Sequence, residues 1–171
     1  MDPNTYLFLN PYLATGLIAV LLFLSALISG SEVAFFSLKP TDISSLEDDS
    51  KSSSSNVLKL LREPNYHDGP RHLLATILVL NNLINVAIVL IATVTAQQVF
   101  PVETLPNWLA VGIHIAGVTL LLVLFGEVIP KLFATSHNIL VAKSMSRTLL
   151  VCKNILKPFW KPLVLLGSRL D

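Results

Sequence analysis

The sequence predicts an all-α membrane protein with three membrane-crossing helices and cytoplasmic juxtamembrane amphipathic helices. Its composition is the first reason, because 53% of the 171 residues are hydrophobic and only 13% are charged, unlike an ordinary water-soluble domain. The second is charge placement. No Asp, Glu, Lys or Arg occurs in residues 3–31, 73–102 or 104–126, and each stretch exceeds the roughly 20 residues that cross a bilayer. We expect one transmembrane domain over residues 1–171.

The first span is predicted over residues 6–37. Pro40 ends it, because the proline ring removes a hydrogen-bond donor and biases the preceding residue away from helical geometry. A juxtamembrane segment follows over residues 40–63. Within it, residues 47–56 are rich in Asp and then in Ser, which predicts a solvated loop before a short stretch of helical apolar spacing.

The second and third spans are predicted over residues 71–99 and 107–135, joined by a loop that contains Pro101 and Pro106. A second juxtamembrane segment covers residues 138–170. Its apolar residues recur at steps of three and four, which is typical of an amphipathic helix lying against anionic lipid. The members of this stripe are Ala142, Met145, Leu149, Cys152 and Leu156.

The basic residues predict the topology of the chain. All 12 Lys and Arg residues lie either between spans one and two or after the core of span three. Under the positive-inside rule, the N-terminus and the second connection are outside, and the first connection and the C-terminus are cytoplasmic. We expect a multi-pass protein of the cell membrane, in contact with lipid. The net charge of +1 gives no reason to expect a nucleic-acid partner.

Span one carries polar groups on one helical face. Ser25, Ser29 and Glu32 stand at positions i, i+4 and i+7, and Ser31 lies beside them. Small residues also pack membrane helices together, so a packing seam is the alternative interpretation.

Span two holds three amides, Asn81, Asn82 and Asn85, within an aliphatic run. Hydrogen bonding between helices would account for one of them. Three amides so close together favour a polar cavity with converging carbonyl oxygens.

Span three contains Gly126, Glu127, Pro130 and Lys131. A carboxylate inside a span costs about 2.5 kcal/mol or more, so Glu127 is expected to face the protein interior with a partner. Pro130 cannot bond the carbonyl four residues earlier, which predicts a free Gly126 oxygen beside the Glu127 carboxylate. The alternative is an internal ion pair between Glu127 and Lys131 at i+4, with a structural proline kink.

These groups supply oxygen ligands of four kinds: hydroxyl, amide, carboxylate and backbone carbonyl. Such a set suits Mg²⁺, Ca²⁺ or Na⁺ and argues against zinc, copper or iron. The sequence holds no HExxH motif, Gly-rich phosphate loop or nucleophile and base pair, so we do not expect an enzyme.

Three stretches resemble the transmembrane domain of the cyclin M and CorC magnesium transporters. They are residues 29–38 (SGSEVAFFSL), 73–85 (with LLATI leading into NNLIN) and 125–131 (FGEVIPK). The resemblance implies a homodimer with a cytoplasmic belt of amphipathic helices. It also implies one partly or fully dehydrated Mg²⁺ in each subunit, exported in exchange for Na⁺.

Carried over by position, the resemblance implies a set of metal ligands, with the direct Ser and Asn ligands left open. These are Ser29, Ser31, Asn81, Asn82, Gly126 and Glu127, supported by Ser25, Asn85, Pro130 and Lys131. Relatives usually continue into nucleotide-binding CBS modules, which this sequence lacks, so we expect it to be a shortened form. The alternatives are a non-transporting membrane assembly or interaction protein, and a site for Na⁺ or Ca²⁺.

Overall fold

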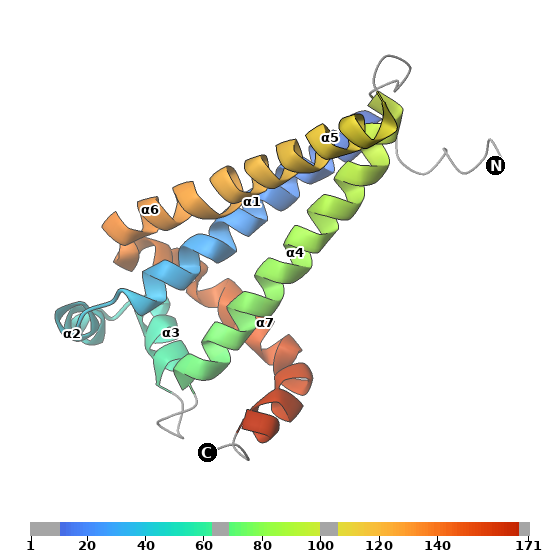
Figure 1. Ribbon diagram of the computed structural model, residues 1–171. Coiled ribbons are helices and arrows are strands. Elements are labelled where there is room, and N and C mark those ends of the chain that lie inside the picture. Colours follow the sequence, from blue (N-terminus) through green and yellow to red (C-terminus); the bar gives the residue numbers. More distant parts are fainter. Residues whose placement is uncertain (1–10, 63–68, 100–105, 168–171) are drawn as a thin grey trace. The chain divides into compact units, whose positions relative to one another are not determined.

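The computed structural model describes residues 11–62, 69–99 and 106–167, and every regular element in these ranges is helical. In chain order (Figure 1) the elements are α1 (Pro11–Phe36), α2 (Pro40–Asp48), α3 (Ser52–Leu61), α4 (Gly69–Val99), α5 (Asn107–Leu121), the π-helix η3 (Leu122–Val128), α6 (Ile129–Ser136) and α7 (Asn138–Gly167). Three stretches are long and apolar enough to cross a membrane: Tyr12–Phe36, Gly69–Thr95 and Trp108–Ser136. The all-α membrane class and the presence of three spans are confirmed. Residues 6–10 of the predicted first span and Pro101 of the predicted loop lie outside the described residues.

The long helices leave many large apolar side chains uncovered. Phe23, Leu90 and Leu120 are 64%, 63% and 59% exposed. Exposure on this scale is unfavourable in water but suits a helix surrounded by lipid. Some hydroxyls in the spans bond within their own helix, as Thr93 Oγ1 does by donating to Val89 O at 2.7 Å.

The chain forms two compact units. One comprises Met1–Leu27 and Asn82–Pro130, and the other comprises Ile28–Asn81 and Lys131–Asp171. Helices α1 and α4 contribute to both units because the boundary falls within them. Among the buried residues of the first unit are Ala14, Ser25, Ile88, Ala92 and Leu122.

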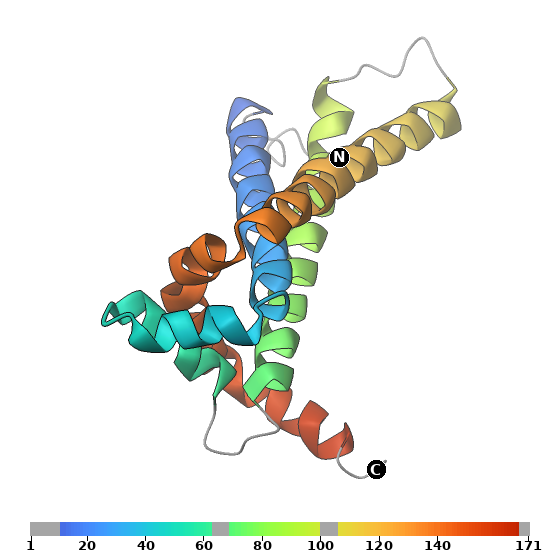
Figure 2. The ribbon, with the colours of Figure 1, turned by 90° about the vertical axis from the view of Figure 1, so that its left-hand side faces the viewer.

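In the second unit, α3 packs against α7 and against α2 (Figures 1 and 2). Val57 and Leu60 of α3 are fully buried, as are Ala142 and Leu149 of α7. This part of the apolar stripe predicted on α7 is therefore covered by protein. Contact between α7 and the lipid surface stays a prediction.

The loop predicted over residues 47–56 is wrong for most of its length. Helix α2 continues to Asp48, and α3 begins at Ser52. The Ser-rich stretch folds as a helix because Ser54 Oγ donates to Asp49 Oδ2 at 2.9 Å and because Ser54, Val57 and Leu60 form one buried face. Serine favours such positions near a helix start, where its hydroxyl bonds locally.

The end of α1 follows the prediction made from Pro40. Helix α1 ends at Phe36, and Pro40 is the first residue of α2, a position where its missing N–H has no cost. Asn138, at the start of α7, contacts the segment that joins α1 to α2. Its Nδ2 donates to Ser37 O at 3.3 Å and lies 3.4 Å from Asp42 Oδ2.

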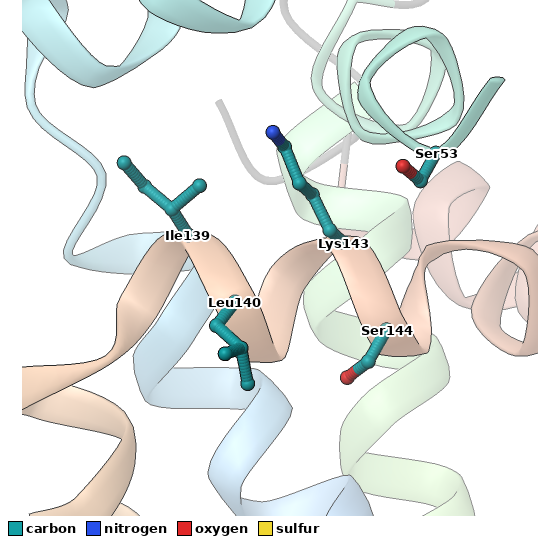
Figure 3. Close-up of a pocket in the computed structure, with 5 residues that line it drawn as sticks. All are labelled: Ser53, Ile139, Leu140, Lys143 and Ser144. Carbon is teal, nitrogen blue, oxygen red and sulfur yellow. The ribbon is translucent and has the colours of Figure 1, made fainter. Parts of the chain in front are cut away.

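Asp49 links α3 and α7. Its Oδ2 accepts from Lys143 Nζ at 2.8 Å, and Figure 3 shows Lys143 in an open surface pocket with Ser53, Ile139, Leu140 and Ser144. Hydrogen bonds from Lys143, then from Ser54 and the Lys51 backbone, lower the pKa of Asp49 from 3.8 to about 2. The ammonium in the pocket is therefore already paired with a carboxylate.

Replacing Asp49 with Asn is expected to lower the thermal stability of the protein slightly at neutral pH. Because the folded-state pKa lies below the unfolded value, the carboxylate stabilises the fold above pH 3.8 and loses this effect as pH falls to about 2. The Tm of wild type and Asp49→Asn in detergent, measured from pH 7 to pH 3, tests this. Asp48→Asn is the control on an exposed neighbour, and an unchanged Tm for Asp49→Asn at pH 7 contradicts the prediction.

Candidate functional site

The side chain of Asn85 joins three helices within the first unit. Ser25 Oγ, on α1, donates to Asn85 Oδ1 at 2.8 Å. Asn85 Nδ2, on α4, donates to Glu127 Oε1, on η3, at 3.1 Å. One amide therefore uses its oxygen for a hydroxyl and its nitrogen for a carboxylate. We call Ser25, Asn85, Gly126 and Glu127 the oxygen cluster.

Gly126 belongs to this cluster because of its missing side chain. It is buried, and a Cβ placed on it would lie 3.1 Å from Ser25 Oγ and 3.6 Å from Ser25 Cβ. Gly112 and Gly117, on the preceding helix α5, have nothing within 4 Å of the same position. The glycine at 126 thus allows the η3 backbone to approach the Ser25 hydroxyl closely.

The predicted proline kink takes the form of a π-helix. Ile129 N–H donates to Leu124 O, five residues earlier, at the end of η3. Pro130 lacks an N–H, so it can donate neither to Gly126 O, four residues earlier, nor to Phe125 O, five residues earlier. In this register Pro130 leaves Phe125 O without its donor, whereas the free Gly126 oxygen expected from the sequence stays a prediction.

The Glu127 carboxylate has an acceptor oxygen left over. The residue is half-buried, and Asn85 donates to Oε1. Among the residues that the structure describes, no hydrogen bond reaches Oε2. A carboxylate with one neutral donor keeps its negative charge uncompensated, and inside a span this favours a cation as a further partner.

The donor set restricts the kind of metal that fits. Within the described ranges there is no group of three or more His, Cys, Asp or Glu side chains able to hold a metal ion. The oxygen cluster supplies one carboxylate together with neutral hydroxyl, amide and carbonyl oxygens. Hard cations that accept neutral oxygens and water suit such a set, whereas zinc and copper prefer nitrogen and sulfur.

Three other predicted ligands, Ser29, Ser31 and Asn81, lie in the second unit. Ser29 and Ser31 are fully buried, and Asn81 is half-buried. Ser29 Oγ has no hydrogen-bond partner among the described residues. An unsatisfied buried hydroxyl costs about 1–3 kcal/mol, so this oxygen is suited to a ligand. Metal binding by these three residues stays a prediction.

The remaining predicted residues have different surroundings. Asn82 is in the first unit and is exposed, whereas Pro130 is half-buried. Lys131, considered above as a partner for Glu127, forms an ion pair with Glu32 instead, with 3.1 Å between Lys131 Nζ and Glu32 Oε2. The ion pair that the sequence suggested inside span three is therefore made with span one.

The sequence resembles known proteins over most of its length. The model of one protein family, the Cyclin M transmembrane N-terminal domain, matches residues 16–170. The chain belongs to this family. The cyclin M domain is also 31% identical over 121 residues to a "UPF0053 protein" of Haemophilus influenzae. That match covers 71% of the chain, which spans about a quarter (26%) of the length of the relative.

Sequence reasoning gave Ser25 and Asn85 supporting roles, but in this cyclin M domain they form the hydrogen bonds of the oxygen cluster. Spacing does contain a signal, since Ser25 precedes Ser29 by one turn and Asn85 follows Asn81 by one turn. Spacing alone does not say which of these four residues bonds to a residue of another helix. The π-helix was not foreseen either, although a proline four residues after a glycine points to a break in regular hydrogen bonding.

Gly126→Ala is expected to destabilise this cyclin M domain by about 1–3 kcal/mol, because the new methyl group would push against the Ser25 hydroxyl. The matched control is Gly117→Ala on α5, where the added methyl meets nothing within 4 Å and helix propensity favours alanine. Tm values in detergent compare the two. Adding Ser25→Ala to Gly126→Ala should recover part of the loss, and equal Tm values for both glycine variants contradict the prediction.

Proposed function

We propose that this cyclin M domain is a magnesium transporter domain, which binds a largely dehydrated Mg²⁺ within the membrane and exports it in exchange for Na⁺. The observation that carries the proposal is the hydrogen-bonded series from Ser25 through Asn85 to Glu127. It brings a hydroxyl, an amide and a carboxylate from three membrane-crossing helices to one place, next to the backbone of Gly126.

The chemistry of Mg²⁺ supports this choice of cation. Mg²⁺ prefers six oxygen ligands at about 2.0–2.1 Å and gives up its water reluctantly. The uncompensated charge of Glu127 offsets part of that dehydration cost. A bound ion would take the place of the Ser25–Asn85 hydrogen bond, because both oxygens would then turn to the cation. Water completes the coordination, and metal binding by Ser29 and Ser31 of the second unit stays a separate prediction.

The direction of transport rests on the charge distribution. With the basic residues in the cytoplasm, the connection between α1 and α4 and the whole of α7 lie on the inner side of the cell membrane. Mg²⁺ would reach the oxygen cluster from the cytoplasm and leave outward. Family resemblance supports a homodimer and the exchange for Na⁺.

Polar residues that only hold helices together are the alternative function. The same hydrogen bonds would serve that purpose, but the buried Ser29 hydroxyl has no hydrogen-bond partner among the described residues and so adds no hydrogen bond between helices. Ca²⁺ and Na⁺ are the alternative ions. Metal–oxygen distances near 2.1 Å in a metal-bound structure would identify Mg²⁺, because Ca²⁺ requires about 2.3–2.6 Å.

Glu127→Gln tests the site directly. The glutamine keeps an oxygen that can accept from Asn85 Nδ2 but removes the negative charge. The expected result is at least about a tenfold rise in the Kd for Mg²⁺, equivalent to about 1.4 kcal/mol, with little change in Tm. Isothermal titration calorimetry measures the Kd, and Asp48→Asn is the control for an exposed carboxylate. A wild-type Kd in Glu127→Gln would refute the site.

Asn85→Ala and Asn82→Ala form a matched pair on the same helix. Asn85 contacts both Ser25 and Glu127, whereas Asn82 is exposed. Asn85→Ala is therefore expected to weaken Mg²⁺ binding by about tenfold or more, and Asn82→Ala by clearly less. The same titration measures both. An equal loss in the two variants would assign Asn82 a ligand role that its surroundings in the first unit do not suggest.

A further inference from the structure

The chain has a second carboxylate in its membrane-crossing helices, and it is paired. Lys131 Nζ, on α6, lies 3.1 Å from Glu32 Oε2, on α1, within the second unit. The side chain of Lys131 is 37% exposed and that of Glu32 is 28% exposed. The oxygen cluster contains neither residue, and the function proposed above assigns no role to this ion pair.

The position of Lys131 in the sequence makes its pairing important. Lys131 follows Glu127 by four residues, and a Glu followed by a Lys at i+4 is the favourable order for an ion pair on one helix. An ammonium bound to Glu127 would compete with any metal ion for the carboxylate. The repulsion between the ammonium and a divalent cation would weaken metal binding further.

We propose that Glu32 is a positioning residue, which holds the ammonium of Lys131 and so leaves the Glu127 carboxylate to the transported cation. Glu32 acts through Lys131 and does not bind the metal itself. This inference rests on the proposed function, because it needs a divalent cation at Glu127. It assigns a role to a carboxylate outside the predicted ligand set.

The two carboxylates are thus distinguished by their partners. Glu32 is matched by a full positive charge, whereas Glu127 is matched by the neutral amide of Asn85. Both side chains are partly exposed, which reduces the strength of the Glu32–Lys131 pair but leaves the 3.1 Å attraction between unlike charges. Removal of the Glu32 charge removes the attraction that holds the ammonium there.

The test is a double-mutant cycle on Glu32 and Lys131, read out as the Kd for Mg²⁺ by isothermal titration calorimetry of the purified protein. Glu32→Gln frees the ammonium and is expected to raise the Kd by about tenfold or more. Lys131→Gln removes the competitor, and this variant is expected to bind Mg²⁺ at least as tightly as wild type. The double variant Glu32→Gln/Lys131→Gln should return to within about threefold of the Lys131→Gln value.

The recovery of affinity in the double variant separates this role from other roles. If Glu32 were a direct ligand, the single and double variants would bind equally weakly. If Glu32 were only structural, Glu32→Gln would lower the Tm and leave the Kd of the folded protein unchanged. Either result overturns the inference. Lys131→Arg keeps the charge and the pairing, so it should keep a Kd close to that of wild type.

A conservative variant covers the case in which Glu32→Gln does not fold. Glu32→Asp keeps the charge but shortens the side chain, so a smaller rise in Kd is expected, again reversed by Lys131→Gln. An unchanged Kd in Glu32→Asp would then overturn the inference. If the wild-type protein bound no Mg²⁺, the proposed function itself would be wrong. If the wild-type protein bound Mg²⁺ and Glu32→Gln bound it with the same Kd, only the role proposed for Glu32 would be wrong.

Discussion

The first unit depends on one constraint, which is that polar side chains inside a membrane must find partners within the protein. Asn85 meets this constraint for two other residues at once, because its oxygen accepts from Ser25 and its nitrogen donates to Glu127. Without that amide, the Glu127 carboxylate would lose its donor in a medium that has no water to supply one. The close approach of Gly126 to Ser25 belongs to the same arrangement.

The partner chosen for each carboxylate determines where negative charge remains. Glu32 and Glu127 are both acidic residues in apolar helices, and the sequence makes them look alike. In the structure an ammonium neutralises Glu32, while an amide leaves the charge of Glu127 in place. An attraction for cations is therefore concentrated at Glu127, which is also the acidic residue that the resemblance assigned to the metal.

The architecture could be predicted from the sequence because a long apolar stretch without charges matches the thickness of a bilayer and suits few positions in a water-soluble domain. The end of α1 before Pro40 could also be predicted, since a proline ring acts locally. The helix at Ser52 could not, because it depends on the burial of Val57 and Leu60 between α3 and α7. Tertiary contacts of this kind override the local preference of a Ser-rich segment.

The same limit applied to the candidate site. Helical spacing placed Asn81 and Asn85 on one face, but only packing decides which amide meets a carboxylate from another helix. The partner of Lys131 was open for the same reason, because i+4 spacing favoured Glu127 while the structure supplies Glu32. The sequence was enough to identify the residue types and their chemistry, but it could not predict which residues of different helices form hydrogen bonds or ion pairs.

The π-helix also sets the rotational phase of the third span. Each residue of an α-helix advances the chain by about 100° around the axis, and a π-helical turn accommodates one residue more than an α-helical turn. The residue added between Leu122 and Val128 is therefore taken up within the wider turn, and Pro130 keeps about the direction relative to α5 that an α-helix one residue shorter would give it. The π-helical turn thus adds one residue to the third span without changing the direction in which the later residues of that span face.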